Sequence, residues 1–413
     1  MSTRVAIVGG ARTPFAKAGT LLKEYTSLDL ATHSVNGVVQ KLDVDPHVVD
    51  RLVYGTVIVH PAVPHLAREV NFKSVLPASV ESLTVTDNCI TGTSAIASVY
   101  DSIMLGRAEI GIAGGVESMS NPPVLFRRTA GRLLLEAGAA RSLTERLRRS
   151  AKLRPSHFRP WSYGIAEPST GLTMGEHTEI TVKEWKIGRQ EQDDIALRSH
   201  HNAHAATADG RLLREIQPIG NVESDTMIRP DTSLEALARL APVFDRSAAG
   251  TITAGNSSPL TDGAAAVMLM SESRAQALGI KALAYVKDFL SVGIHPADGL
   301  LMGPGIAVPR LLQRNNLSLD QIDIVEMHEA FGGQVAANMK AWANGWKESA
   351  IGTVDPDRLN PLGSSIAIGH PFAATGARIA TTLANEMERR NARYGLMSIC
   401  GAGATATAML LER

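Results

Sequence analysis

The chain has 413 residues, of which 44% are hydrophobic, so it is long enough for a large core or for two to three domains. Its formal net charge is +0, so the overall charge indicates neither a nucleic acid nor a membrane as partner. Two cysteines cannot form a disulfide framework, and they favour a reducing compartment. The apolar run near the amino terminus is too short for a signal peptide, and no run reaches the length of a membrane span. We therefore expect a cytoplasmic protein.

The first part of the chain alternates short apolar strands with helical patterns. Strands are predicted at VAIVGG, RLVYGTVIV, LTVTDNC and IGIAGG, and a helix at LDLATHSVNGVVQKL. A further helix follows Cys89, because Ile96, Val99 and Ile103 recur every three or four residues, as one buried face requires. Strands that alternate with helices predict an α/β sheet covered by helices.

The carboxy-terminal part repeats this order. It offers AYVKDFLSVGI, a helical IAVPRLLQRN, the strand IDIVEMHEAF, a helix over AATGARIATTLANEMERR, and two final strands, YGLMSIC and TATAMLLE. A turn, a helix of small residues, an apolar strand and a glycine run occur once after Cys89 and again between His370 and Cys400. This recurrence predicts two similar half-domains.

The alternation of strands and helices stops in the middle of the chain, which indicates an insertion. We expect an amino-terminal half over residues 1–123 that is completed by residues 260–283. An inserted loop domain should cover residues 124–259, and the second half should cover residues 284–413.

The first part of this insertion is strongly basic. Residues 121–160 contain ten basic and two acidic side chains, a net charge of +8, so the rest of the neutral chain carries −8. Ser142 and Glu145 form the S-x-x-E pattern that marks the start of a helix. Leu143, Leu147 and Ala151 then form a narrow apolar stripe, which could pack the helix on the core or serve as a docking surface.

Two thiols and two histidines suit a reaction that needs a nucleophile, its base and a second acid or base. Cys89 lies between an apolar strand and a helix, where the helix amino terminus favours a thiolate. His328 follows an apolar strand, His370 lies in a Gly–His–Pro segment before a helix of small residues, and Cys400 ends a strand. The alternatives are a small buried hydrophobe for each cysteine and a capping or core-edge role for each histidine.

Eight segments, in order over nearly the whole length, resemble the thiolase superfamily: GARTPF, the Cys89 segment, AGGVESMS, TMGEH, GTITAGNSSPLTDGAAAV, MHEAF, GHPFAATGAR and the Cys400 segment. Three features make the chain most similar to 3-ketoacyl-CoA thiolases, in particular to the thiolase subunit of β-oxidation multienzyme complexes: HEAF, the basic insertion, and ALRSH with DTSLEALARLAPVF downstream. The resemblance implies the thiolase fold, an α/β fold of two similar halves with mixed sheets between helices, plus the inserted loop domain.

The resemblance also implies the activity and the role of each catalytic residue. A 3-ketoacyl-CoA would be cleaved by CoA to acetyl-CoA and a shortened acyl-CoA through an acyl-cysteine intermediate. Cys89 would be the nucleophile, and His370 would accept its proton and donate to the thioester oxygen. His328 would hold a water that completes this oxyanion site, and Cys400 would move the proton at C2. Backbone N–H groups at Cys89 and near Ala402 would form a second oxyanion hole.

Coenzyme A is implied as a substrate, with no covalently bound cofactor and no metal. The resemblance places six residues along the pantetheine, and ordinary core packing is the alternative for all but the serine: Met174, Ala254, Ser258, Met302, Ala330 and Phe331. A homodimer or tetramer is expected, with contact to a β-oxidation partner subunit or a membrane surface through residues 125–155. Ala404 and Ala406 depart from the glycines usual after the second cysteine, and their methyl groups could narrow the C2 pocket.

Several other readings compete. Within the family, the alternative is an acetoacetyl-CoA thiolase that condenses acetyl-CoA. The non-catalytic alternative is a thiolase-like protein that binds acyl-CoA or lipid. GAGATA matches a dinucleotide fingerprint, but the sequence stops before the helix, strand and acidic residue that this motif needs. HEAFG does not match the H-E-x-x-H zinc motif, because position 332 is Gly332 and not a histidine. His200, His201 and His204 are interpreted as part of a solvated helix, since no third metal ligand is evident. A β-ketoacyl synthase typically has a histidine where this chain has Cys400.

Overall fold

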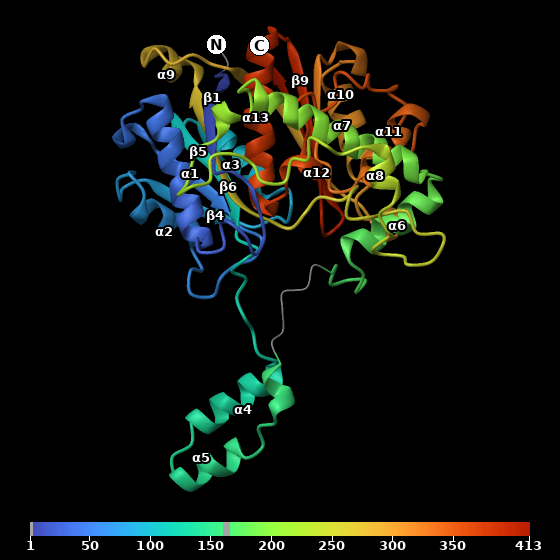
Figure 1. Cartoon of the computed structure of the whole chain (residues 1–413). Coiled ribbons are helices and arrows are strands. Elements are labelled where there is room, and N and C mark those ends of the chain that lie inside the picture. The colour runs from blue at the N-terminus through green and yellow to red at the C-terminus, as the bar shows by residue number, and fades with distance from the viewer. Residues whose placement is uncertain (1–2, 160–165) are drawn as a thin grey trace. The chain divides into compact units, whose positions relative to one another are not determined.

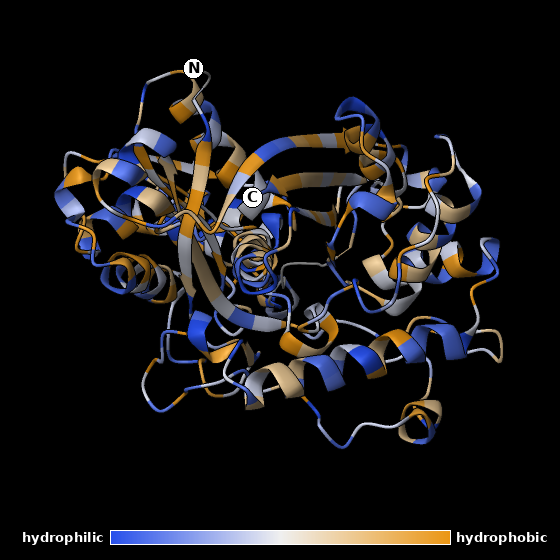
Figure 2. Cartoon of the chain, turned by 90° about the horizontal axis from the view of Figure 1, so that it is seen from above, coloured by the Kyte–Doolittle hydropathy of each residue, from blue (hydrophilic) through white to orange (hydrophobic). Residues whose placement is uncertain are grey.

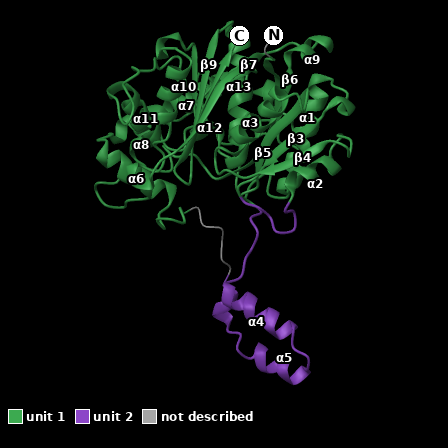
Figure 3. Ribbon diagram, turned by 180° about the vertical axis from the view of Figure 1, so that it is seen from behind, with its two compact units in different colours: residues 1–57, 65–120, 166–413 green, residues 58–64, 121–165 purple. Residues whose placement is uncertain are grey.

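The computed structural model describes residues 3–159 and 166–413. The chain divides into two compact units (Figure 3). The first comprises Met1–Val57, His65–Ser120 and Ala166–Arg413, and the second comprises Ile58–Pro64 and Asn121–Ile165.

The strands of the first unit form one mixed sheet. Their bounds are β1 Val5–Arg12, β2 Ala16–Lys17, β3 Arg51–Gly55, β4 Glu81–Val85, β5 Ile110–Glu117, β6 Thr261–Ser271, β7 Ala284–Gly293, β8 Ile324–Met327, β9 Tyr394–Gly401 and β10 Thr405–Glu412. Among the described residues the order is β4-β3-β5-β6-β1-β7-β10-β9-β8, and β2 pairs with β6. The strand predicted at RLVYGTVIV ends early, at Gly55.

The two halves of this sheet have the same topology. In the first half the order β3-β5-β6-β1 has one parallel pair followed by two antiparallel pairs. In the second half β8-β9-β10-β7 repeats this sequence of pairings. β1 pairs with β7 and joins the halves into a continuous sheet. The predicted duplication therefore exists as a repeated order of strands.

Helices cover both faces of the sheet. Those of the first unit are α1 Ser27–Leu42, α2 Leu66–Lys73, α3 Thr91–Met104, α6 Met174–Glu184, α7 Arg189–Ala208, α8 Leu234–Ala238, α9 Glu272–Ala277, α10 Pro304–Arg314, α11 Gly332–Asn344, α12 Ser365–Ile368 and α13 Thr375–Arg390 (Figure 1). Successive residues of a strand point to opposite faces. Accordingly a Cβ on Gly9 would meet Leu42 of α1, and one on Gly10 would meet Thr381 of α13. α1 and α13 thus lie on opposite faces.

α3 and α13 pack against each other through glycines at their first turns. A Cβ at Gly376 would lie 2.4 Å from the backbone nitrogen of Thr93, and one at Gly92 would lie 2.8 Å from the carbonyl oxygen of Ala373. Only glycine permits this approach of two backbones. The contact brings together the segment that follows Cys89 and the segment that follows His370.

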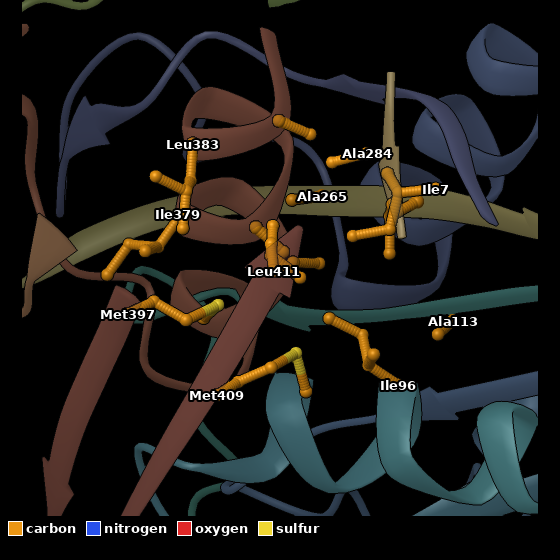
Figure 4. Packing of buried hydrophobic residues seen from close by; sticks show 14 of the residues in the cluster. Ile7, Ile96, Ala113, Ala265, Ala284, Ile379, Leu383, Met397, Met409 and Leu411 are labelled. Carbon is orange, nitrogen blue, oxygen red and sulfur yellow. The ribbon is translucent and has the colours of Figure 1, made fainter. Parts of the chain in front are cut away.

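The largest apolar cluster lies between these two helices and the strands. Ile96 of α3, Ile379 and Leu383 of α13, and Met397 and Met409 of the second half all take part (Figure 4). Viewed from above, the central strands are coloured mainly as hydrophobic, whereas the outer helices mix polar and apolar residues (Figure 2). Side chains of both halves thus share one core, which holds the active-site segments in place.

The described part of the second unit contains the α-helices α4 Arg128–Gly138 and α5 Leu143–Ser150 and a short 3-10 helix, Pro155–Phe158. Ser142 caps α5 by accepting a hydrogen bond from the backbone N–H of Glu145, as the S-x-x-E pattern predicts. No residue of α5 is buried, and Leu143 and Leu147 are 74% and 65% exposed. The described part of its own unit therefore leaves this stripe uncovered.

This unit is smaller than the insertion expected over residues 124–259. Residues 166–259 cluster instead with the first unit, because α6 and α7 pack against α11 of the second half. No helix in the described parts of the chain combines the length and the apolar character needed to cross a membrane.

Candidate active site

Cys89 lies in a tight turn between β4 and α3. Asn88, just before it, adopts a left-handed conformation with φ of 47°, which asparagine tolerates better than most residues. The hydroxyl of Thr91 accepts a hydrogen bond from the backbone N–H of Asp87 and donates to the carbonyl of Asn88. These bonds hold the thiol at the start of α3, partly exposed.

His370 faces this thiol. Its Nε2 lies 3.2 Å from Cys89 Sγ, and its Nδ1 lies 2.6 Å from the hydroxyl of Thr375. The backbone N–H of His370 donates to Thr261 of β6, which fixes the loop on the sheet. If Nδ1–H donates to Thr375, the lone pair of Nε2 points at the thiol, as a general base requires.

Burial determines the resting charges of this pair. Desolvation raises the pKa of the Cys89 thiol to about 12, against a smaller opposing effect of the Ala402 backbone. Desolvation, with a contribution from the cation of Arg378, lowers the pKa of His370 to about 3. The resting pair is therefore a neutral thiol beside a neutral imidazole, and the helix terminus does not suffice to hold a free thiolate.

Cys400 lies at the end of β9, close to the turn of Cys89. The side-chain amide of Asn88 donates a 2.9 Å hydrogen bond to the carbonyl of Ala402 and links the two segments. Cys400 is 1% exposed. Burial and the neighbouring Cys89 raise the pKa of its thiol well above the usual value. It is therefore a thiol that can give a proton to a strong base but does not ionise freely.

His328 follows β8 directly and is fully buried. Its ring lies 4.1 Å from that of His370, centroid to centroid. Its Nδ1 is 2.7 Å from the hydroxyl of Ser365, while its Nε2 has no hydrogen-bond partner among the described residues. Burial lowers the pKa of His328 well below the usual value. The structure thus brings all four predicted catalytic residues together.

The six predicted CoA contacts fall into two groups. Met174, Ala330 and Phe331 pack in the apolar cluster that contains Cys400. Ala254 and Ser258 line an adjoining cavity of about 540 Å³. Met302 is the exception, because it packs in a different cluster with Val182 and Ile187.

This cavity also involves residues that the sequence did not single out. Phe244 lines it and stacks edge-on against Phe331, with ring centroids 5.8 Å apart. Arg229 lines it too, and the backbone N–H of Arg229 donates to Nδ1 of His200. His200 is 4% exposed, so the interpretation of its helix as solvated is wrong at this position. Only tertiary packing reveals that these two residues line the cavity, although Phe244 ends the DTSLEALARLAPVF segment of the resemblance.

The alanines after Cys400 are accommodated in two different ways. Ala404 is fully buried at a φ of 55°, in the same apolar cluster as Cys400. A left-handed alanine is strained by about 1 kcal/mol relative to glycine. Ala406 is relieved by its neighbour, because a Cβ at Gly303 would lie 2.5 Å from the Ala406 methyl group.

Two family models cover almost the whole chain. The thiolase N-terminal domain matches residues 5–273, and the thiolase C-terminal domain matches residues 280–413. The chain is 40% identical to the 3-ketoacyl-CoA thiolase of Colwellia psychrerythraea and 42% identical to that of Pseudoalteromonas translucida. Both alignments cover 99% of this chain and 97% of the relative.

Solved structures agree in fold. An acetyl-CoA acetyltransferase of Bacillus anthracis superposes with a TM-score of 0.87 at 30% identity, over 100% of this chain and 99% of the other. Human mitochondrial 3-ketoacyl-CoA thiolase superposes with a TM-score of 0.85 at 29% identity, over 99% and 98%. The chain belongs to the thiolase family, and the predicted family and fold are confirmed.

Proposed function

We propose that this chain is a 3-ketoacyl-CoA thiolase that uses CoA to cleave 3-ketoacyl-CoA in fatty-acid β-oxidation. The observation that carries the proposal is the 3.2 Å approach of His370 Nε2 to Cys89 Sγ, with Cys400 beside it. A nucleophile, its base and a second proton carrier in one buried site suit cleavage of a carbon–carbon bond next to a thioester. The high identity to relatives with this name supports the same activity.

In the first half of the reaction, His370 takes the proton of Cys89 as sulfur attacks the C3 ketone. Because both groups are neutral at rest, proton transfer and attack occur together, and thiolate character develops on Cys89 only during the attack on bound substrate. The C2–C3 bond then breaks, and its electron pair moves into the enolate of acetyl-CoA. Cys400 protonates C2, which leaves an acyl group on Cys89 and a thiolate on Cys400.

In the second half, free CoA restores the enzyme. Its thiol gives a proton to the Cys400 thiolate and attacks the acyl group on Cys89. Acyl-CoA leaves, and Cys89 recovers its proton from His370, so atoms and charges balance over the cycle. Coenzyme A is thus a substrate, and no other cofactor takes part in these steps.

A thiolysis assay tests the proposal. Purified protein with CoA and 3-ketoacyl-CoA of short, medium and long chain is expected to form acetyl-CoA and the shortened acyl-CoA, measured by loss of the 3-ketoacyl absorbance and by chromatography. Condensation of acetyl-CoA without measurable thiolysis would assign the chain to the biosynthetic alternative. Binding of acyl-CoA without turnover would assign it to the non-catalytic class.

The free edge of the sheet supports a homodimer. β4 ends the strand order and pairs only with β3 among the described residues. Leu83 of β4 and Phe72 of α2 are 38% and 57% exposed. An exposed edge strand with apolar neighbours readily pairs with a second copy, and here such pairing would also steady the turn that bears Cys89.

The second unit supports a peripheral contact with an anionic membrane in the cytoplasm. In sequence it carries ten basic and two acidic residues. Leu135 of α4 is 77% exposed, and Leu143 and Leu147 of α5 are also mostly exposed. Leucines exposed next to arginines are typical of helices that lie in a lipid interface. Residues 125–155 would hold the enzyme at the membrane by charge and by inserted leucines.

Reversing three exposed bases tests this contact. Arg146, Arg148 and Lys152 changed together to Glu should abolish sedimentation with anionic vesicles at low salt and leave thiolysis of a short substrate within about twofold. Arg149 is left in place, because its guanidinium bonds to the Glu136 carbonyl and supports the unit. Vesicles of neutral lipid are the control.

Other outcomes assign the bases differently. Wild-type protein that ignores anionic vesicles but co-purifies with an acidic partner subunit would assign the surface to that subunit. A large rise in the KM for CoA in the triple variant would place the bases at the CoA phosphates.

A further inference from the structure

A buried cation lies behind the two active-site histidines. Arg378 on α13 is fully buried, and its Nη2 donates to the hydroxyl oxygens of Ser364, at 3.1 Å, and Ser365, at 3.3 Å. The hydroxyl of Ser365 in turn lies 2.7 Å from Nδ1 of His328. A chain of three side chains therefore runs from a cation to a histidine whose Nε2 is buried and has no hydrogen-bond partner in the described part of the protein.

The direction of the hydrogen bonds follows from the donor inventory. An arginine side chain can only donate, so the oxygen of Ser365 accepts from Arg378. The O–H of Ser365 is then free to donate, and Nδ1 of His328 is its one described contact able to accept. Bonds that run the same way along a chain strengthen one another. With Nδ1 as the acceptor, every hydrogen bond of this chain runs in one direction, and the proton of the neutral imidazole lies on Nε2.

We propose that Arg378 and Ser365 are positioning residues that fix His328 as a neutral imidazole with its N–H on Nε2, aimed at the substrate. The two histidines then offer opposite tautomers: His370 presents a lone pair to Cys89, and His328 presents a donor. Through the water that the resemblance places on His328, this donor stabilises the thioester oxygen as it gains charge in the enolate. This proposal rests on the proposed thiolase function and adds to it the residues that set the polarity of His328.

The charge of Arg378 also keeps both imidazoles neutral, as a directed donor requires. Arg378 lowers the pKa of His328 and of His370, in addition to the effect of burial. Burial lowers the pKa of Arg378 itself, and the carboxyl groups of Glu326, Glu215 and Glu329 act in the opposite direction. Burial is the larger cause, and the cation one hydroxyl away from His328 adds to it in disfavouring the imidazolium.

Ser364 and Ser365 form a matched pair for the test. Both accept from the same nitrogen of Arg378, but only Ser365 contacts His328. Ser365→Ala should slow exchange of the C2 hydrogens of acetyl-CoA about tenfold or more, because an unanchored donor is misplaced. Acylation of Cys89 by an acyl-CoA, which uses the other oxyanion hole, should stay within about threefold. Ser364→Ala should leave both rates within about threefold.

Nitrogen-15 spectra of histidine-labelled protein supply the readout that loss of packing alone would not move. The His328 signals, assigned by their absence in His328→Asn, should show one protonated Nε2 in the wild type and in Ser364→Ala, and a mixture of tautomers in Ser365→Ala. A proton on Nδ1 in the wild type, or equal loss of exchange in the two serine variants, would overturn the proposal. Normal exchange in His328→Ala would instead refute the role of His328 while the spectra still report on Arg378 and Ser365.

Discussion

Replacing Cys89 with alanine is expected to abolish thiolysis, with a fall in kcat of at least about a thousandfold, because no other group can form the covalent intermediate. The loop itself should survive the change. Thr91 and the backbone of Asp87 and Asn88 hold the turn, whereas the thiol makes its contact with Nε2 of His370. The substitution therefore removes the nucleophile and leaves the fold of the turn intact.

Mass spectrometry of tryptic peptides measures the intermediate directly. After incubation with an acyl-CoA and without free CoA, the wild-type peptide that contains Cys89 should carry one acyl group, and the Cys89→Ala peptide none. Thermal unfolding of the two proteins should coincide within a few degrees, which serves as the control for folding. Near-normal turnover in Cys89→Ala would show that the proposed mechanism is wrong.

Replacing Cys400 with alanine should separate the two halves of the chemistry. Acyl transfer from an acyl-CoA to Cys89 needs no proton at C2, so the acyl enzyme should still form. Exchange of the C2 hydrogens of acetyl-CoA should fall about a hundredfold or more, as the loss of a general acid or base predicts. Net thiolysis should fall with it.

The matched measurement is hydrogen–deuterium exchange into acetyl-CoA, followed by proton NMR for wild type, Cys89→Ala and Cys400→Ala. Burial raises the pKa of Cys400 well above its usual value, so the thiol is the resting form. The rate of C2 hydrogen exchange should therefore not increase near neutral pH, as it would if Cys400 ionised there. Normal exchange in Cys400→Ala would transfer the proton step to another group, with His328 as the neighbouring candidate.

Much of this site could be predicted because its residues sit in local motifs. Three such motifs are visible in the sequence: an Asp–Asn–Cys turn before a helix of small residues, a Gly–His–Pro turn before a second such helix, and a cysteine before a glycine run. Each motif requires a particular local backbone conformation. Gly92 and Gly376 allow the backbones of the two helices to come into contact, because the helices touch at these glycines. The duplication could be predicted for the same reason, because apolar periodicity survives when residue identity does not.

The charge states could not be predicted in this way. Position at a helix terminus favours a Cys89 thiolate, but burial has the larger effect and raises its pKa to about 12. Desolvation depends on every chain segment that covers the thiol, and these segments lie hundreds of residues apart. The exposure of Leu143 and Leu147 was also beyond the sequence, since a helical stripe has the same pattern whether or not a surface covers it.

The sequence by itself determined the family, the alternation of strands and helices and the duplicated order, and it indicated the four side chains that we propose react. These features depend on local periodicity and on motifs that keep their meaning wherever they lie. Only the tertiary structure decided which residues stand behind the site. Arg378 and Ser365 read in the sequence as ordinary helix positions, and they reach His328 only because α12, α13 and the end of β8 meet in one core. Hydrogen-bond direction and desolvation are properties of that assembled neighbourhood, so no single segment could show them.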